Sequence, residues 1–176
     1  MIPLQHPQRK HRLTTSLACL ALSCVAWTLL ASAQGAPTPA SAQRQNDVRE
    51  KGASVMPFSL DQTLHTFKKT DTGGVQQVRA NNAAADQVVM IRSHLHSIEK
   101  SFSARDFSAP AHIHGSDMPG MAEMKAANPD ELAVIYRDLD DGAELDYASH
   151  SAAIIAAIHR WFDAQLADHG ADATGR

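Results

Sequence analysis

Cysteine is nearly absent from this sequence, and its two examples, Cys19 and Cys24, both lie close to the N-terminus. Both fall within a segment that has the features of a secretory signal peptide, which is removed on export. After cleavage the chain has no disulfide and no thiolate, which excludes catalysis by a nucleophilic cysteine and metal sites built on cysteine sulfur. The fold must therefore be held together by burial of apolar side chains, which a chain of this length permits.

The N-terminal segment lacks the continuity of a membrane-spanning helix. Its apolar run, residues 13–30, follows basic residues and is interrupted by Ser and Thr. Ala31-Ser32-Ala33 then supplies the small-x-small pattern that signal peptidase recognises. We expect residues 1–33 to be a signal peptide, so that the protein begins at Gln34, is periplasmic or secreted, and has no stable membrane span.

Several functional signatures are missing as well. The sequence has no G-x-S-x-G, H-E-x-x-H, P-loop or G-x-G-x-x-G pattern, and no C-x-x-C-H motif for covalent haem. The expected signal peptide holds three of the 16 basic residues and none of the 19 acidic ones, which leaves a charge of 13 − 19 = −6. This negative balance argues against nucleic acid and against an anionic membrane surface as partners.

Histidine, in contrast, is abundant, since eight of the ten histidines follow residue 33. Ala111–Met124, A-H-I-H-G-S-D-M-P-G-M-A-E-M, combines two imidazoles, two carboxylates and three thioethers with the Gly and Pro of a loop and a helix start. In an extended segment, His112 and His114 would point to the same side. Neutral imidazole is the commonest protein ligand for Zn, Cu, Ni and Fe, so this segment predicts a metal site.

Turn residues and apolar spacing predict the same order of elements twice. Strands are expected at 63–69 and 75–79 and again at 132–138 and 143–147, with helices at 84–102 and from Ser149 or Ser151 to about 169. Two such tandem β-β-α units most simply pool their strands into one antiparallel sheet. We therefore predict an α+β fold with both helices packed on one face of that sheet.

The other segments set the expected domain limits. Residues 34–55 begin with a stretch rich in Ala, Pro, Ser and Gln and are predicted to be a flexible tether, although a short helix fits within 47–56. A single domain is expected over 56–170, followed by a disordered tail at 171–176. Residues 103–120, between the two units, are expected at an edge of the domain, where functional loops usually lie.

Three stretches resemble a known family: T-L-H-T-F-K-K at 63–69, A-H-I-H-G-S-D-M-P-G at 111–120 and H-R-W-F-D-A-Q-L-A-D-H-G at 159–170. Over most of 56–170 the chain resembles small exported bacterial proteins, many of which carry the automatic label aspartate carbamoyltransferase. The resemblance implies a shared fold and a shared residue pattern, here His65, His114, Asp117, Met118, His159 and His169. Carbamoyltransferase activity does not follow, because the Ser-Thr-Arg-Thr phosphate loop and the two α/β domains of such enzymes are absent.

The histidines differ in where their expected elements place them. On the first helix, His94 lies on the flank of the apolar stripe and can reach inward, while His96 faces water. His169 falls on the apolar face of the last helix, and the side on which His65 lies depends on the register of its strand. We expect a metal site at His114, with His94, His112, Met118 and His169 as further ligands and His65 and Asp117 as additional candidates.

Some of these residues also have a purely structural interpretation. Ser116 or Asp117 could cap a short helix that follows, because a side-chain oxygen can accept the free amide hydrogens of its first turn. Met121 and Met124 are suited to fill the core. His169 could interact with the last carbonyl groups of its own helix.

Three classes of function remain. We favour a periplasmic binding protein for a transition metal, with copper first because methionine is present and thiolate absent, zinc or nickel next, and non-covalent haem after them. A structural or interaction domain without a metal is the first alternative. A small metal-assisted enzyme, which would leave one metal position open to water, is the second. No residue is assigned a catalytic role, and the oligomeric state is left open.

Overall fold

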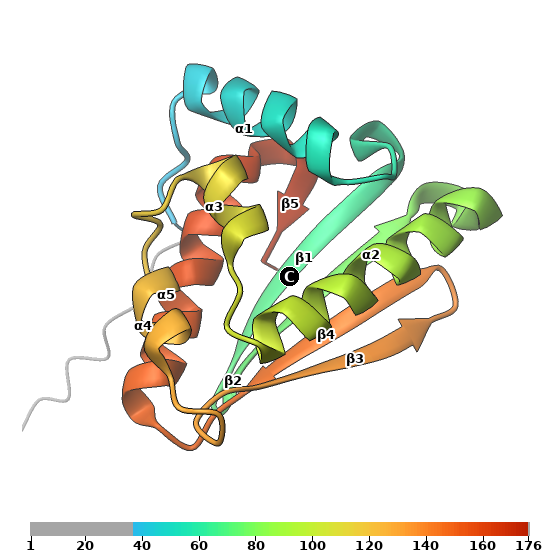
Figure 1. Ribbon diagram of the computed structural model, residues 1–176. Coiled ribbons are helices and arrows are strands. Elements are labelled where there is room, and N and C mark those ends of the chain that lie inside the picture. Colours follow the sequence, from blue (N-terminus) through green and yellow to red (C-terminus); the bar gives the residue numbers. More distant parts are fainter. Residues whose placement is uncertain (1–36, 176) are drawn as a thin grey trace, which may run out of the picture. The chain divides into compact units, whose positions relative to one another are not determined.

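Two β-hairpins form the central sheet of the protein (Figure 1). The computed structural model describes residues 37–175, so the expected signal peptide and its cleavage site lie outside the described residues. Strands β1 (Thr63–Thr70) and β2 (Gly73–Ala80) form the first hairpin, and β3 (Ala133–Leu139) and β4 (Gly142–Ala148) form the second. Both hairpins lie where the turn residues predict them.

The sheet has the strand order β3-β4-β2-β1-β5. β2 pairs antiparallel with β4, which joins the two hairpins into one sheet as predicted. The short strand β5 (Ala173–Thr174) pairs in parallel with β1, so the sheet is mixed rather than wholly antiparallel. The prediction of a disordered tail at 171–176 is therefore wrong for these two residues, whose pairing with β1 compensates for their low apolar content.

One face of the sheet is buried and the other faces solvent. Side chains alternate between the two faces along each strand, as extended backbone requires. On the inner face, Phe67, Val78 and Leu145 are almost completely buried. On the outer face, Arg137 forms an ion pair with Glu144 across β3 and β4 at 2.9 Å. This alternation fixes the register of the sheet, because a slip by one residue would exchange the two faces.

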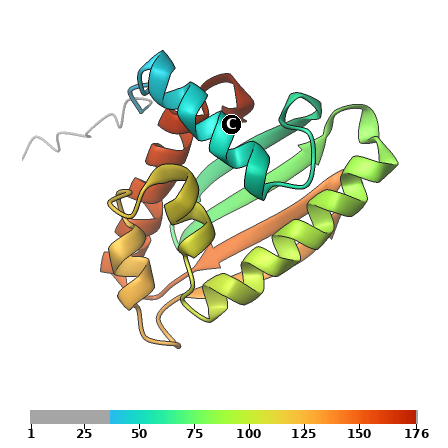
Figure 2. The ribbon, with the colours of Figure 1, turned by 45° about the horizontal axis from the view of Figure 1, so that its top comes forward.

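Two long helices cover the inner face of the sheet (Figure 2). α2 (Ala85–Ser103) contacts β2, β3 and β4, and α5 (Ala152–His169) contacts β1 and β2. The helix α2 buries most of its predicted apolar stripe, namely Val88, Ile91, Leu95 and Phe102. The α+β fold with helices on one face is thus confirmed. Within residues 37–175, no helix combines the length and apolar character needed to cross a membrane.

The segment rich in histidine and methionine is helical over most of its length. It forms α3 (Ser108–His114) and α4 (Met121–Ala126), joined by a short turn. Because residues two apart on a helix point in nearly opposite directions, His114 is buried while His112 is exposed. The prediction of an extended segment with both imidazoles on one side is therefore wrong.

The start of α4 also differs from the prediction. Its first turn follows Gly120, which has a left-handed backbone with φ of 83°, and no side chain caps it. Neither Ser116 nor Asp117 acts as the cap that the sequence suggested, because the turn places both upstream of the helix start. Met121 and Met124 are buried in the core, as their structural interpretation predicts.

A helix also occupies most of the predicted tether. α1 (Ala42–Val55) lies against α3 and α5 and buries Val48. The backbone amide of Ala40 donates to the carbonyl of Ala167 at 3.0 Å, which fastens the start of this segment to α5. The prediction of a flexible segment is wrong for 42–55, whereas the alternative of a short helix within 47–56 agrees with α1. Composition does not reveal the whole helix, because short helices gain most of their stability from tertiary contacts.

Candidate functional site

A cavity of about 60 Å³ lies between the sheet and helices α2, α3 and α5. Its wall is mostly apolar and includes the aromatic rings of Phe58, Phe67 and Trp161. A water molecule occupies about 30 Å³ in the liquid, so the cavity has room for about two waters or one small ligand. We call it the histidine cavity, because its polar lining consists of His65, His94, His114, His169, Gln76 and Gln165.

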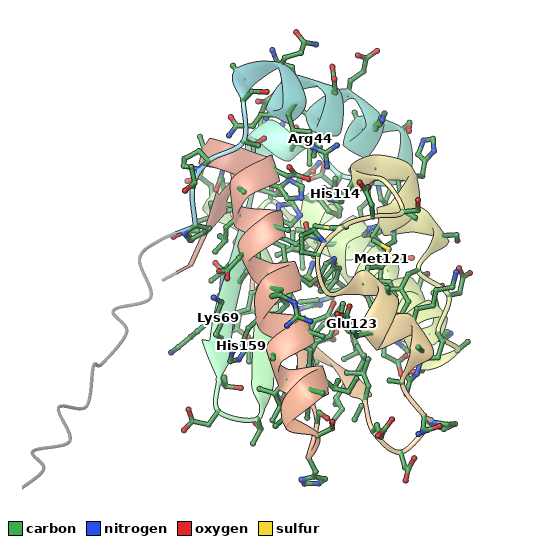
Figure 3. All side chains as sticks on the ribbon, turned by 90° about the vertical axis from the view of Figure 1, so that its left-hand side faces the viewer. Arg44, Lys69, His114, Met121, Glu123 and His159 are labelled. Carbon is green, nitrogen blue, oxygen red and sulfur yellow. The ribbon has the colours of Figure 1, made fainter. Side chains whose placement is uncertain are left out.

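His114 is held in the cavity wall by a carboxylate and a guanidinium. Its Nδ1 lies 2.8 Å from Oδ2 of Asp168. Because an ionised carboxylate only accepts, Nδ1 carries the proton, and when the ring has one proton Nε2 is left as an acceptor. Arg44 donates to both oxygens of Asp168, at 3.0 and 2.6 Å, and to the backbone carbonyl of His114 at 2.6 Å. Figure 3 shows Arg44 on α1 directly beside His114.

The charge on Asp168 is maintained by these partners. Although burial opposes it, hydrogen bonds from His114 and Arg44 lower the pKa of Asp168 to about 2. The carboxylate is therefore ionised at neutral pH and keeps the His114 ring in one orientation. A carboxylate that fixes one imidazole nitrogen in this way is typical of metal-binding and of general-base histidines.

The ring of His169 lies next to the ring of His114 on one side and next to the ring of His65 on the other. The ring centroids of His114 and His169 are 5.2 Å apart, and those of His169 and His65 are 5.3 Å apart. Nε2 of His169 lies 3.1 Å from Oε1 of Gln165. Since that amide oxygen only accepts, Nε2 of His169 carries the proton, and its Nδ1 is left as a lone-pair donor.

Burial favours the neutral form of three of the histidines that line the cavity, His65, His94 and His169. It lowers the pKa of His65 to about 4, although the charge and the backbone of Asp172 act in the opposite direction. Burial, together with the nearby His65 and His114, lowers the pKa of His169 well below its usual value of 6.5. Burial likewise lowers the pKa of His94. Neutral imidazole is the form that can accept a hydrogen bond or bind a metal.

One ring nitrogen of a histidine that lines the cavity has no partner. Among the described residues, Nδ1 of His65 is the one buried side-chain nitrogen or oxygen without a hydrogen bond. Leaving such a group unpaired in the interior costs about 1–3 kcal/mol. Buried polar atoms are almost always paired, so this nitrogen marks the point at which a ligand atom is expected.

The cavity brings together four of the seven residues that the sequence suggested as ligands. These are His65, His94, His114 and His169. His112 and Asp117 are exposed and do not line the cavity. Met118 is buried, but its sulfur accepts a hydrogen bond from the indole of Trp161 at 3.0 Å and does not line the cavity either.

His159, which the sequence resemblance singled out, lies elsewhere and has a structural role. Its Nε2 is 2.9 Å from the carbonyl oxygens of both Thr70 and Gly73. This bond ties the turn of the first hairpin to α5 (Figure 3). His159 is therefore not part of the histidine cavity.

The sequence analysis missed Asp168, Gln165 and Arg44. The first two could have been found, because they continue the buried stripe of α5 from Trp161 at spacings of four and three residues. A polar residue on a buried stripe needs a partner, which is a signal for a site. Arg44 gave no such signal, since it lies 124 residues from Asp168 in a segment with the composition of a tether.

The cavity does not hold a preformed metal centre. Within residues 37–175, no three His, Cys, Asp or Glu side chains are placed to bind one metal ion. The chain matches no family model, no curated protein and no solved structure. The chemistry of the cavity is therefore what points to a function.

Proposed function

We propose that this protein is an exported binding protein whose ligand occupies the histidine cavity. The observation that supports the proposal most directly is the buried, unpaired Nδ1 of His65, a residue that lines the cavity together with three other histidines. A ligand that pairs with this nitrogen would offset the roughly 1–3 kcal/mol that the bare nitrogen costs. Export, and with it a periplasmic or secreted location, is proposed from the signal-peptide pattern of residues 1–33.

The ligand is a small group that accepts lone pairs. In their neutral forms, His114 and His169 each donate from one nitrogen to a protein oxygen and keep the other nitrogen bare. The bare nitrogens suit two kinds of ligand, a small molecule with O–H or N–H groups or a transition-metal ion. A volume of about 60 Å³ is far below the roughly 300–1,000 Å³ of sites for drug-sized molecules, so the ligand is small.

Among metals, copper is the favoured ligand and zinc and nickel are the alternatives. Imidazole suits all three ions, and Cu²⁺ binds such nitrogen sites most tightly. Methionine sulfur does not add to the preference for copper, because the sulfur of Met118 accepts a hydrogen bond from the indole of Trp161. Non-covalent haem, the further candidate from the sequence, does not fit a cavity of this volume.

A small metal-assisted enzyme is the second candidate, favoured by the pairing of Asp168 with His114. A carboxylate that holds Nδ1 leaves Nε2 as an oriented proton acceptor, as general-base catalysis requires. The binding function ranks first because the cavity has room for little more than the ligand itself.

The test is thermal melting of the untagged chain from Gln34 onward. The protein is melted with Cu²⁺, Zn²⁺ or Ni²⁺, and separately with formamide or pyrrole as small neutral donors, at pH 7.5 and pH 5. A ligand at a hundred times its dissociation constant stabilises the fold by about 2.7 kcal/mol. The gain should shrink at pH 5, where protons compete for the imidazole nitrogens.

Two variants make this test specific to the cavity. His65→Phe removes the unpaired nitrogen, whereas His96→Phe changes an exposed histidine on α2 and serves as the matched control. Stabilisation should be lost in the first variant and retained in the second. If no ligand raises the melting temperature of the wild type, or if His65→Phe responds as the wild type does, the proposal is wrong. A structural or interaction domain is then the better account.

A further inference from the structure

The lining of the histidine cavity favours a ligand without charge. Among the described residues that line it there is no Asp, Glu, Lys or Arg. Burial lowers the pKa of His65 to about 4 and holds the pKa values of His94 and His169 below the usual 6.5, so these rings are neutral at pH 7.5. The fourth ring, His114, already faces the carboxylate of Asp168 at 2.8 Å. An ion would lose its hydration here without gaining a free partner of opposite charge, which costs far more than burying an uncharged polar group.

His169 presents a bare nitrogen to a hydrogen-bond donor. Its Nε2 lies 3.1 Å from Oε1 of Gln165, which only accepts, so Nδ1 of the neutral ring is left as an acceptor. Within residues 37–175 this Nδ1 makes no hydrogen bond, and the completely covered atoms without a partner include only Nδ1 of His65. Nδ1 of His169 therefore keeps open surface, on a residue that lines the cavity.

A hydrogen-bond donor fits these rings better than a metal ion does. No three His, Cys, Asp or Glu side chains of the described residues are placed to bind one ion. The rings of His65 and His169 are stacked, with centroids 5.3 Å apart and an angle of 12° between their planes. A metal ion lies in the plane of each imidazole that binds it, and two nearly parallel stacked planes do not meet at one ion. An N–H or O–H group needs only one acceptor nitrogen.

We propose that the cavity binds a small uncharged molecule, such as a short amide, an alcohol or an azole, that donates an N–H or O–H hydrogen bond to Nδ1 of His169. This inference rests on the proposed function and names the ligand class of the same cavity. A second donor on the same molecule is then the partner that the unpaired Nδ1 of the stacked His65 ring lacks. Phe67 and Trp161 line the same space and supply apolar contacts for the rest of the molecule. The volume of about 60 Å³ limits the ligand to a few non-hydrogen atoms.

The ligand enters between the end of α1, α2 and α3. Most residues that line the cavity are buried. Apart from His169, those that keep some exposure are Val55, His94, Ile98 and Ala109. Three of these four are apolar, and burial lowers the pKa of the fourth, His94. The mouth of the cavity therefore also favours an uncharged ligand.

The experiment measures dissociation constants from the ¹H–¹⁵N shifts of the histidine rings at pH 7.5, on the chain from Gln34 onward. Pyrrole is compared with furan, a ring of the same size without an N–H group. Because furan leaves the buried acceptor unpaired, pyrrole should bind about 5- to 150-fold more tightly. Formamide is compared with the formate and formamidinium ions, which have nearly its shape but carry a charge. Both ions should bind at least about tenfold more weakly than formamide.

Two pairs of variants locate the site. His169→Phe should abolish the preference for pyrrole over furan, whereas His96→Phe, at an exposed position of α2, should keep it. Ala109→Trp places a large ring at the mouth and should slow the entry of pyrrole. Ser108→Trp, at an exposed neighbouring position outside the lining, should leave the entry rate unchanged.

The outcomes separate this inference from the proposed function. Equal affinity of the wild type for pyrrole and furan would overturn the inference, and this comparison needs no variant to fold. Binding of either ion as tightly as formamide, or a preference for pyrrole that survives in His169→Phe, would overturn it too. If the wild type binds Cu²⁺, Zn²⁺ or Ni²⁺ but neither formamide nor pyrrole, this inference fails and the binding function stands. If it binds none of them, both fail.

Discussion

Replacing His65 with phenylalanine removes a buried imidazole at a position that can accept the larger ring. The His65 ring is surrounded by Phe58, Phe67 and His169, with centroids at 6.0, 6.4 and 5.3 Å. A cavity of about 60 Å³ adjoins it. The substitution also removes the unpaired Nδ1, which costs about 1–3 kcal/mol when buried. At pH 8 the metal-free variant should therefore be at least as stable as the wild type.

The larger effect of this substitution is on the pH dependence of stability. Burial lowers the pKa of His65 to about 4 in the folded protein, whereas the unfolded chain has the usual value of about 6.5. Between these values the unfolded state binds more protons, so the free energy of unfolding falls as the pH falls. At pH 5 the loss from His65 alone is about 2 kcal/mol. His94 and His169 add losses of stability of the same sign, but the wild type and His65→Phe share these losses.

The assay is urea unfolding followed by the fluorescence of Trp161, in the presence of a chelator, at pH 8 and pH 5. The drop in the free energy of unfolding between the two pH values should be about 2 kcal/mol smaller for His65→Phe than for the wild type. His96→Phe, at an exposed position, should leave the drop unchanged. If His65→Phe loses as much stability on acidification as the wild type, His65 is not held neutral by burial and the reasoning is refuted.

Two further changes test how the elements around the cavity are held. Gly120→Ala should destabilise the fold by at least about 2 kcal/mol, because φ is 83° and an added Cβ would lie 2.0 Å from a carbonyl oxygen of α5. Gly115→Ala, with φ of 92° but only a side-chain oxygen nearby, should cost less in the same urea experiment; an equal cost would contradict this explanation. Arg44→Met removes the ion pair to Asp168 and, since Arg44 is 38% exposed, should cost only about 1–2 kcal/mol. Amide hydrogen exchange should then accelerate throughout α1, and unchanged exchange would show that Arg44 does not hold this helix.

The elements that the sequence predicts correctly are those with local signals. Asp and Gly at the turns mark both hairpins, and apolar spacing marks α2 and α5. β5 and the start of α1 have no such signal, because each is stabilised by docking against residues more than a hundred positions away. Composition alone therefore assigns both segments to flexible chain.

In the candidate site, too, local sequence signals are predictive and contacts between distant residues are not. Residue type suffices to select His65, His94, His114 and His169 as candidates, and all four reach one cavity. His112 lies outside this cavity, because its expected orientation depends on a strand-like period of two, whereas α3 has the helical period. The contact of His114 with Asp168 spans 54 residues and depends on the packing of α3 against α5, which no local pattern encodes.

The measurement that tests the central claim most directly is a long-range ¹H–¹⁵N spectrum of the histidine rings, recorded before and after addition of formamide at pH 7.5. In the metal-free protein, Nδ1 of His65 should have the chemical shift of a bare, unprotonated nitrogen. Formamide should move this resonance together with that of Nδ1 of His169, while His96 stays unchanged. If Nδ1 of His65 is protonated without ligand, or does not respond to Zn²⁺, formamide or pyrrole, the claim that this nitrogen receives a ligand is contradicted.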